Sequence, residues 1–206
     1  MPHSIQSSDA DIDRESRLIV LASTSPRRKA LLEQVGLIFT TAAIDIDESV
    51  HTDESSADYV VRLAQQKALA AVPDFSSQTL IIAADTTVTI DGLILAKPTD
   101  RDHAFSMWQL LAGRTHQVMT GVAVACGEEI VTCNVVTDVD FMMLNKLQMQ
   151  EYWDTGEPIG KAGGYAIQGY GAAYIPRING SYSNVVGLPL VETLALISHF
   201  KRPLER

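Results

Sequence analysis

A short apolar run followed at once by a helix-start signal is the feature that most constrains how this chain can fold. Residues 17–22 (RLIVLA) have the composition of a buried strand, and Ser25-Pro26 follows within a few residues. Serine is a good N-cap, proline suits the first helical position, and Gly36 suits the end of the helix. The pattern predicts a strand, a tight loop and a helix in succession, a unit typical of α/β proteins.

The rest of the chain continues in the same way before strands begin to pair as hairpins. The expected elements are a strand over 37–43, a helix opening at Ser55 or Ser56, a strand over 79–84 with Asp85 at its end, a hairpin turn at Asp91-Gly92, a helix capped by Asp100, a long hairpin over 115–142, a helix capped by Asn145, a hairpin turn at Asn179-Gly180 and a last helix starting at Leu188-Pro189. This order predicts an α/β fold with a mixed, twisted central sheet and flanking helices.

The length of 206 residues suggests one domain or two tightly joined lobes, expected over 17–206 after a polar, flexible N-terminal tail over 1–16. The tail lacks the apolar core of a signal peptide, and no apolar run approaches the ~20 residues that span a bilayer. Cys126 and Cys133 are expected to be free thiols, although their spacing across a hairpin would also permit a bridge. We therefore expect a cytoplasmic protein with no membrane partner.

Acidic residues outnumber basic ones by 25 to 16, which gives a formal net charge of −9. Such an average surface repels a nucleic-acid polymer, and the sequence has no basic run of the kind that binds one. A small anion could still bind wherever the basic residues converge. The positions of the lysines and arginines therefore matter more than their number.

The loop before the first helix is the first candidate site. Ser23, Arg27 and Arg28 lie around a helix start, where free N–H groups and the positive end of the dipole favour an anion. Two arginines in a first turn are locally unfavourable, a conflict typical of functional positions. A bound phosphate group would resolve it, whereas the alternative is that both arginines are solvated or paired with nearby acids.

Asp85 and Thr86 form the second candidate site, because ligands of open α/β sheets bind beyond the carboxyl ends of strands. A carboxylate there can bind a metal or take a proton from water, or it can simply belong to a turn. Lys67 and Lys97 are in suitable places to join such a site, although each alone resembles an ordinary surface lysine.

An acidic stretch and a glycine-rich stretch complete the candidates. Asp45, Asp47 and Glu48 could hold a divalent cation through carboxylate oxygens, or could form a solvated loop. The glycines near Gln168 allow backbone to approach a ligand, and a glutamine amide can both donate to and accept from the edge of a base. The alternative is a plain loop between strands.

Eight motifs occur in an order that resembles the Maf family, and together they cover residues 17 to 200. They are Leu-Ala-Ser-Thr-Ser-Pro-Arg-Arg (21–28), Ala-Asp-Thr-Thr-Val (84–88), Lys97-Pro98, Gly-Arg-Thr-His-Gln-Val-Met-Thr-Gly-Val (113–122), Gly-Glu-Pro (156–158), Lys-Ala-Gly (161–163), Ile-Gln-Gly (167–169) and Gly-Ser-Tyr-Ser-Asn-Val-Val-Gly-Leu-Pro (180–189).

The resemblance implies a fold like that of the inosine triphosphate pyrophosphatases, often as a homodimer. It implies hydrolysis of a nucleoside triphosphate to the monophosphate and pyrophosphate with a divalent cation, Mg²⁺ or Mn²⁺. It further implies that Asp85 is the proton acceptor and that three positions select the substrate, namely Arg27, Thr86 and Gln168. The remaining pocket positions that it implies are Ser23, Arg28, Glu48, Lys67 and Lys97.

The Ile-Gln-Gly motif resembles the branch of the family that acts on dTTP and UTP, although Gly160 stands where that branch usually has aspartate. The resulting hypothesis is that the basic residues hold the triphosphate, that Asp85 and Glu48 lie near the metal, and that Asp85 activates the attacking water. Two alternatives remain: a non-catalytic nucleotide sensor that regulates cell division or septum formation, and a nucleotidyltransferase that passes the monophosphate to an acceptor.

Overall fold

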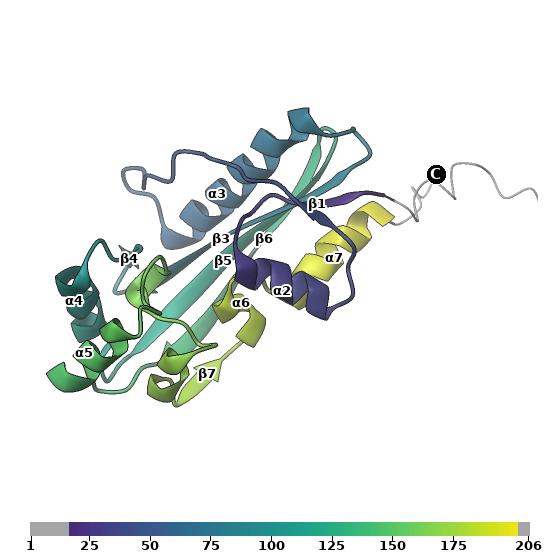
Figure 1. The fold of residues 1–206 in the computed structure, drawn as a ribbon. Coiled ribbons are helices and arrows are strands. Elements are labelled where there is room, and N and C mark those ends of the chain that lie inside the picture. The colour runs from purple at the N-terminus through teal and green to yellow at the C-terminus, as the bar shows by residue number, and fades with distance from the viewer. Residues whose placement is uncertain (1–16, 202–206) are drawn as a thin grey trace, which may run out of the picture.

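The computed structural model describes residues 17–201, so the tail expected at 1–16 and residues 202–206 lie outside its description. Seven strands form one mixed sheet in the order β2-β1-β3-β5-β6-β7, with β4 paired to β3 (Figure 1). This confirms the predicted class, an α/β fold with a mixed central sheet and flanking helices. No helix in the described part of the chain is long and apolar enough to cross a membrane.

The element bounds follow the sequence signals closely at the helix starts. The strands are β1 (Ile19–Leu21), β2 (Thr40–Thr41), β3 (Leu80–Ile90), β4 (Leu93–Leu95), β5 (Thr115–Cys126), β6 (Glu129–Asp140) and β7 (Arg177–Asn179). The helices are α2 (Pro26–Gln34), α3 (Ser56–Ala71), α4 (Arg101–Leu111), α5 (Lys146–Asp154), α6 (Tyr182–Val186) and α7 (Leu190–Lys201). The side chains of Ser25, Ser55, Asp100 and Asn145 each accept a backbone N–H as N-caps.

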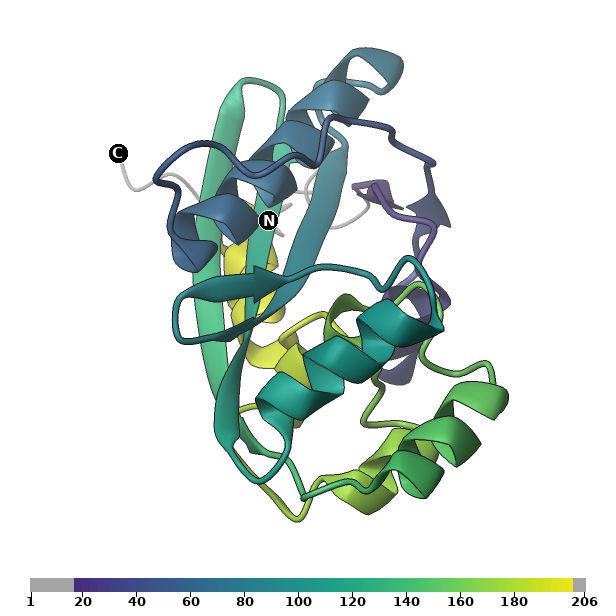
Figure 2. The same ribbon diagram turned by 90° about the vertical axis from the view of Figure 1, so that its left-hand side faces the viewer.

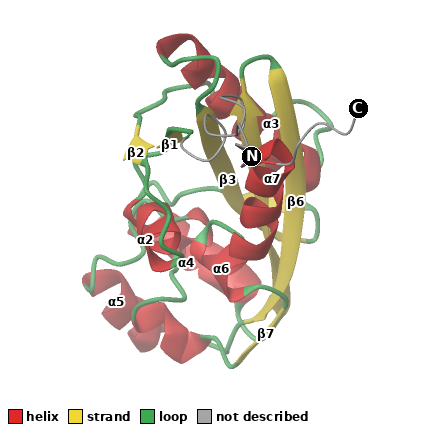
Figure 3. Ribbon diagram, turned by 90° about the vertical axis from the view of Figure 1, so that its right-hand side faces the viewer, coloured by secondary structure: helices red, strands yellow, loops and turns green. Residues whose placement is uncertain are grey.

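Helices cover both faces of the sheet, and Figures 2 and 3 show α3 and α7 on opposite faces. The α3 face is packed mainly by small residues, with Ala64 and Ala68 against Ala83 and Ala123. A methyl group at Gly121 on β5 would overlap the backbone carbonyl of Val60. Small side chains at this interface therefore let α3 approach the sheet closely.

A separate apolar cluster lies at the other end of the molecule, under α4 and α5 (Figure 1). Trp108 and Tyr152 are fully buried there, and Trp108 donates to the Gly164 carbonyl at 3.0 Å. Strand β3 runs through both ends of the core, because Ile82 packs near α7 while Val88 packs near Trp108. One continuous strand thus joins the two halves of the molecule.

Three sequence expectations were wrong in detail. Asp85 lies in the middle of β3 rather than at its end, because pairing with β5 carries the strand on to Ile90. The strand expected over 37–43 is reduced to Thr40–Thr41, which pairs only with the short β1. Asn179-Gly180 forms no hairpin, since the chain passes from β7 through Gly180 (φ 133°) into α6.

Candidate active site

The site lies beside the edge of β3 that does not face β5, in the gap between β1 and β4. Strand β1 ends opposite Ile82 and the pairing with β4 begins at Val88, so within residues 17–201 no strand pairs with that edge in between. A cavity of about 360 Å³ occupies this region. All nine residues expected at the site line it: Ser23, Arg27, Arg28, Glu48, Lys67, Asp85, Thr86, Lys97 and Gln168.

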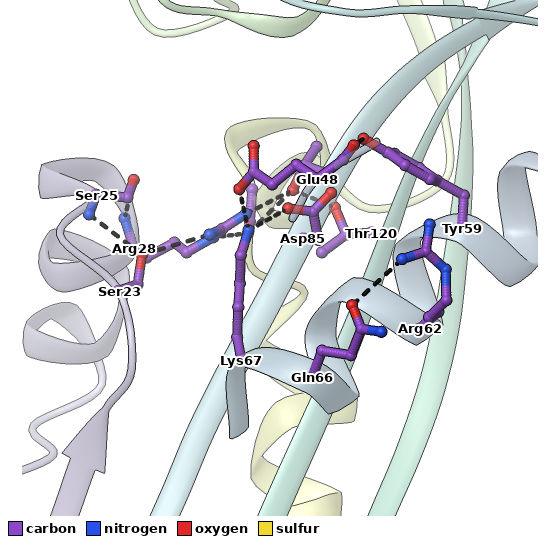
Figure 4. A network of polar contacts seen from close by, with 12 residues as sticks. Ser23, Ser25, Arg28, Glu48, Tyr59, Arg62, Gln66, Lys67, Asp85 and Thr120 are labelled. Atoms are coloured by element: carbon purple, nitrogen blue, oxygen red, sulfur yellow. Dashed lines mark hydrogen bonds and ion pairs between the residues drawn. The ribbon is translucent and has the colours of Figure 1, made fainter. Parts of the chain in front are cut away.

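Lys67 connects the two carboxylates of the cavity. Its Nζ donates to Asp85 Oδ1 at 2.6 Å and to Glu48 Oε1 at 2.7 Å (Figure 4). The lysine extends from α3 and is only 9% exposed, because α3 packs closely on the sheet. Lys97 Nζ contacts the other oxygen of Glu48 at 3.4 Å. Two lysines therefore neutralise the two carboxylates from opposite sides of Glu48.

Glu48 is placed by contacts to α3 although it belongs to an irregular segment. The hydroxyl of Tyr59 donates to the Glu48 carbonyl at 2.9 Å (Figure 4). Burial alone would raise the pKa of the Glu48 carboxyl, but the hydrogen bond and charge of Lys67, with the charge of Lys97, outweigh it and lower the pKa below its usual value. Glu48 is thus an anionic ligand or acceptor near neutral pH.

Arg28 forms the polar centre of the opposite side of the cavity. Its Nε donates to the Gly187 carbonyl at 2.8 Å, and its Nη2 donates to Thr86 Oγ1 at 3.2 Å. A further contact joins Nη1 to Ser23 Oγ at 3.4 Å (Figure 4). Burial lowers the pKa of Arg28 while the charge of Asp85 raises it, and a guanidinium remains charged in either case.

Asp85 and Thr86 are adjacent in β3, and their side chains point to opposite faces of the sheet. Side chains alternate along a strand, so Asp85 meets Lys67 on the α3 face while Thr86 meets Arg28 on the α2 face. Thr86 is also held by Thr120 of β5, whose hydroxyl lies 2.9 Å away. The centre of β3 therefore fixes both halves of the site relative to each other.

Arg27 and Gln168 reach the cavity from other segments. Arg27 Nε lies 3.4 Å from the Val186 carbonyl, and burial lowers the pKa of this arginine. Gln168 is exposed and lines the cavity from the glycine-rich segment after α5. Asp45 and Asp47 are not part of the lining, and Asp47 instead accepts the N–H of Ser49 at 2.9 Å. Only Glu48 of the acidic stretch reaches the site.

The sequence did not single out Lys161 as a site residue, yet it lines the same cavity. Its Nζ donates to the Glu157 carbonyl, and burial and the nearby charge of Arg27 lower its pKa. The only available signal was its place in the Lys-Ala-Gly motif. With it, the cavity contains five cationic side chains and two carboxylates, a positive surplus in a chain of net charge −9.

The two carboxylates fit a divalent cation only with help from a ligand. No group of three or more His, Cys, Asp and Glu side chains in residues 17–201 is arranged to hold a metal ion. Asp85 and Glu48 each use one oxygen on Lys67. Magnesium commonly takes one or two carboxylates and completes its shell with phosphate oxygens and water. The pair suits such a cation bound together with a phosphorylated ligand.

Comparison with known proteins agrees with the motifs. The chain is 52% identical to a dTTP/UTP pyrophosphatase of Acinetobacter baylyi, and the match covers 88% of this chain and 98% of that protein. It is 47% identical to a dTTP/UTP pyrophosphatase of Shigella sonnei, and this match covers 91% of this chain and 95% of that protein. Among solved structures it is similar to the Staphylococcus aureus Ham1 protein, with a TM-score of 0.46, 13% identity and coverage of 71% of this chain and 81% of that one. The profile of the Maf-like protein family matches residues 18–200, and the chain belongs to that family.

Proposed function

We propose that this protein is a nucleoside triphosphate pyrophosphatase that hydrolyses dTTP or UTP to the monophosphate and pyrophosphate. The observation that carries the proposal is the convergence of five cationic side chains around Asp85 and Glu48 in one cavity. A triphosphate is the ligand whose charge complements such a surplus in an acidic protein. The names of relatives at 52% and 47% identity point to the same substrates.

In the proposed mechanism the phosphates lie among the basic residues of the cavity. Arg27 and Arg28 offer forked donors, while Lys67, Lys97 and Lys161 act as point charges. These groups lower the barrier by stabilising charge that develops on the phosphate oxygens, which is the main contribution in phosphoryl chemistry. The hydroxyls of Ser23 and Thr86, held by Arg28, complete the polar wall.

Asp85 is the proposed general base. One of its oxygens is fixed by Lys67, which leaves Oδ2 to orient a water molecule and accept its proton. The water oxygen bonds to the α-phosphorus as the bond from that phosphorus to the bridging oxygen breaks, and pyrophosphate leaves. A Mg²⁺ or Mn²⁺ ion held by Asp85 and Glu48 would supply charge neutralisation at the phosphates.

Release of pyrophosphate from a panel of nucleotides tests the proposal. We expect turnover of dTTP and UTP with free monophosphate as the second product and without any added acceptor. Nucleotide binding without release would favour the regulatory sensor, and a requirement for an acceptor would favour the transferase. Chelation of divalent cations should abolish turnover, and separate addition of Mg²⁺ and Mn²⁺ should identify the ion used.

A cytoplasmic location and a homodimer belong to the same proposal. Cys126 and Cys133 are both free thiols, which suits a reducing compartment. The homodimer rests on the resemblance to the family alone. Sedimentation equilibrium of the purified protein tests it, and a monomer across micromolar concentrations would contradict it.

A further inference from the structure

Glu157 lies outside the cavity lining, yet its carboxylate holds the segment that carries Gln168. Its Oε2 accepts the backbone N–H of Tyr170 at 2.7 Å, and its Oε1 accepts that of Gly171 at 2.9 Å. Both donors follow Gln168 closely in the chain. A single carboxylate therefore fixes the downstream end of the glycine-rich loop, which we define as residues 166–171.

The upstream end of the loop is tied to the same carboxylate through Tyr152. The Tyr152 hydroxyl donates to Glu157 Oε1 at 2.6 Å and accepts the backbone N–H of Ala166 at 3.1 Å. Tyr152 is fully buried on α5, where its ring lies 5.1 Å from that of Trp108 between centroids. The anchor is thus seated on a rigid part of the core, and Gln168 lies between its two attachment points.

The glycines of the loop make this close approach possible. A Cβ atom at Gly169 would overlap Glu157 Oε2, and one at Gly171 would lie 2.5 Å from the Tyr152 hydroxyl oxygen. Glycine leaves room for the Glu157 carboxylate at position 169, and for the Tyr152 hydroxyl and the Ala166 carbonyl at position 171. The glycine spacing around Gln168 is therefore explained by the anchor.

Residue 157 also contacts the second segment of the cavity wall on this side. Lys161 Nζ donates to the Glu157 backbone carbonyl, and Lys161 itself lines the cavity. Burial would raise the pKa of the Glu157 carboxyl, but the hydrogen bonds from Tyr152 and from the loop outweigh it and lower the pKa. The group is therefore a carboxylate at neutral pH and offers only acceptors to the donors around it.

We propose that Glu157 is a positioning residue that holds Gln168 in place to recognise the base of the nucleotide. The inference rests on the proposed function, since it assigns the loop to the base rather than to the triphosphate. A glutamine amide reads a base edge more effectively when its backbone is already fixed, because a mobile loop would lose conformational entropy on each binding event. Glu157 touches neither substrate nor metal in this role and acts through the loop alone.

The test compares Glu157→Gln with the wild-type protein on dTTP, UTP and a purine triphosphate. Glutamine keeps the shape but replaces one acceptor oxygen with a donor, so one loop contact is lost. We expect the preference for pyrimidine over purine, measured as the ratio of kcat/KM values, to fall roughly tenfold, which corresponds to about 1.4 kcal/mol. The inhibition constant of inorganic tripolyphosphate, which lacks a base, should stay within about twofold of wild type.

Two further variants keep the test decisive. Tyr152→Phe removes only the hydroxyl that ties Ala166 to Glu157, and it should reduce the same ratio even if the Glu157 variant folds poorly. Glu151→Gln removes a charge from the exposed side of α5 and should change nothing. An unchanged pyrimidine preference in both anchor variants, or an equal loss of tripolyphosphate binding, would overturn the inference. A wild-type protein that releases no pyrophosphate would instead overturn the proposed function.

Discussion

Lys67 Nζ lies 2.6 Å from Asp85 Oδ1, which joins helix α3 to the centre of strand β3 by an ion pair. Both side chains are largely shielded from water, with exposed fractions of 11% and 13%. A charge in such surroundings depends strongly on its partner. The pair therefore behaves as a unit, and changing either member alters the environment of the other.

Asp85→Asn should nearly abolish turnover while leaving the fold intact. Asparagine keeps an oxygen for Lys67 but is a poor proton acceptor, so we expect kcat to fall by ~10²–10⁴. Pyrophosphate release measures the loss, and thermal unfolding should still show a folded protein, because Lys67 keeps its ion pair with Glu48. Asp102→Asn, on the exposed first turn of α4, is the matched control. Full activity in the Asp85 variant would refute the assigned role.

Lys67→Met should shift the pH dependence of the reaction. Burial raises the pKa of Glu48, while the hydrogen bond and charge of Lys67 lower it, so this pKa should rise when the lysine is removed. The acid limb of the kcat/KM profile is therefore expected to move to higher pH, with activity present above the new pKa and lost as the pH falls through it. Lys29→Met on the exposed surface of α2 serves as the control. An unmoved acid limb contradicts this role of Lys67.

Arg28→Lys should weaken both the site and the fold, although it conserves the charge. Lysine cannot reproduce the fork that reaches Gly187, Ser23 and Thr86 at once. We expect a loss of about 1–3 kcal/mol in the free energy of unfolding, because partly buried acceptors lose their donors. Chemical denaturation measures it, and KM for dTTP should rise in parallel. Arg101→Lys, an exposed position, should leave both quantities unchanged.

His116 should make the protein less stable as the pH falls below neutrality. The side chain is 2% exposed with Nε2 against the Tyr165 hydroxyl, and burial lowers its pKa to about 4. The unfolded chain takes up the proton near pH ~6.5, so stability is full above that pH and declines from there toward the folded pKa. Between pH ~7.5 and ~5.5 we expect a loss on the order of 1 kcal/mol from this residue.

The comparison that isolates this effect is His116→Gln against wild type. Chemical denaturation at the two pH values gives the free energy of unfolding of each protein. The variant should be less sensitive to pH over this interval, even if its absolute stability is lower. Equal pH dependence in both proteins would show that His116 is not the group responsible.

The helix starts were predictable because their causes are local. Ser25, Ser55, Asp100 and Asn145 each cap a backbone N–H three residues ahead, a contact visible in a few letters of sequence. The position of Asp85 within β3 was not, since a run of Asp-Thr-Thr resembles the end of a strand. Pairing of Asp85 with Gly121, which is 36 positions away, extends the strand and is decided by tertiary contacts.

Residue chemistry and motif order were sufficient to predict nine of the side chains that line the cavity. All nine expected residues line one cavity, although their roles in binding and catalysis stay predictions. Glu157 and Lys161 were not selected, because their places in the Gly-Glu-Pro and Lys-Ala-Gly motifs do not show which side chains they contact. Their significance comes from the approach of α5 to the glycine-rich loop, which depends on packing around Trp108 and Tyr152.

The opposite orientations of Asp85 and Thr86 along β3 leave little tolerance for changes in strand length. Insertion or deletion of one residue between Leu80 and Ala84 would slip the register and exchange the faces of the two side chains. The carboxylate would then meet the guanidinium of Arg28 and the hydroxyl would meet the ammonium of Lys67. We therefore expect the loops to tolerate changes in length, whereas the number of residues in this half of β3 must stay constant to keep Asp85 and Thr86 on their faces of the sheet.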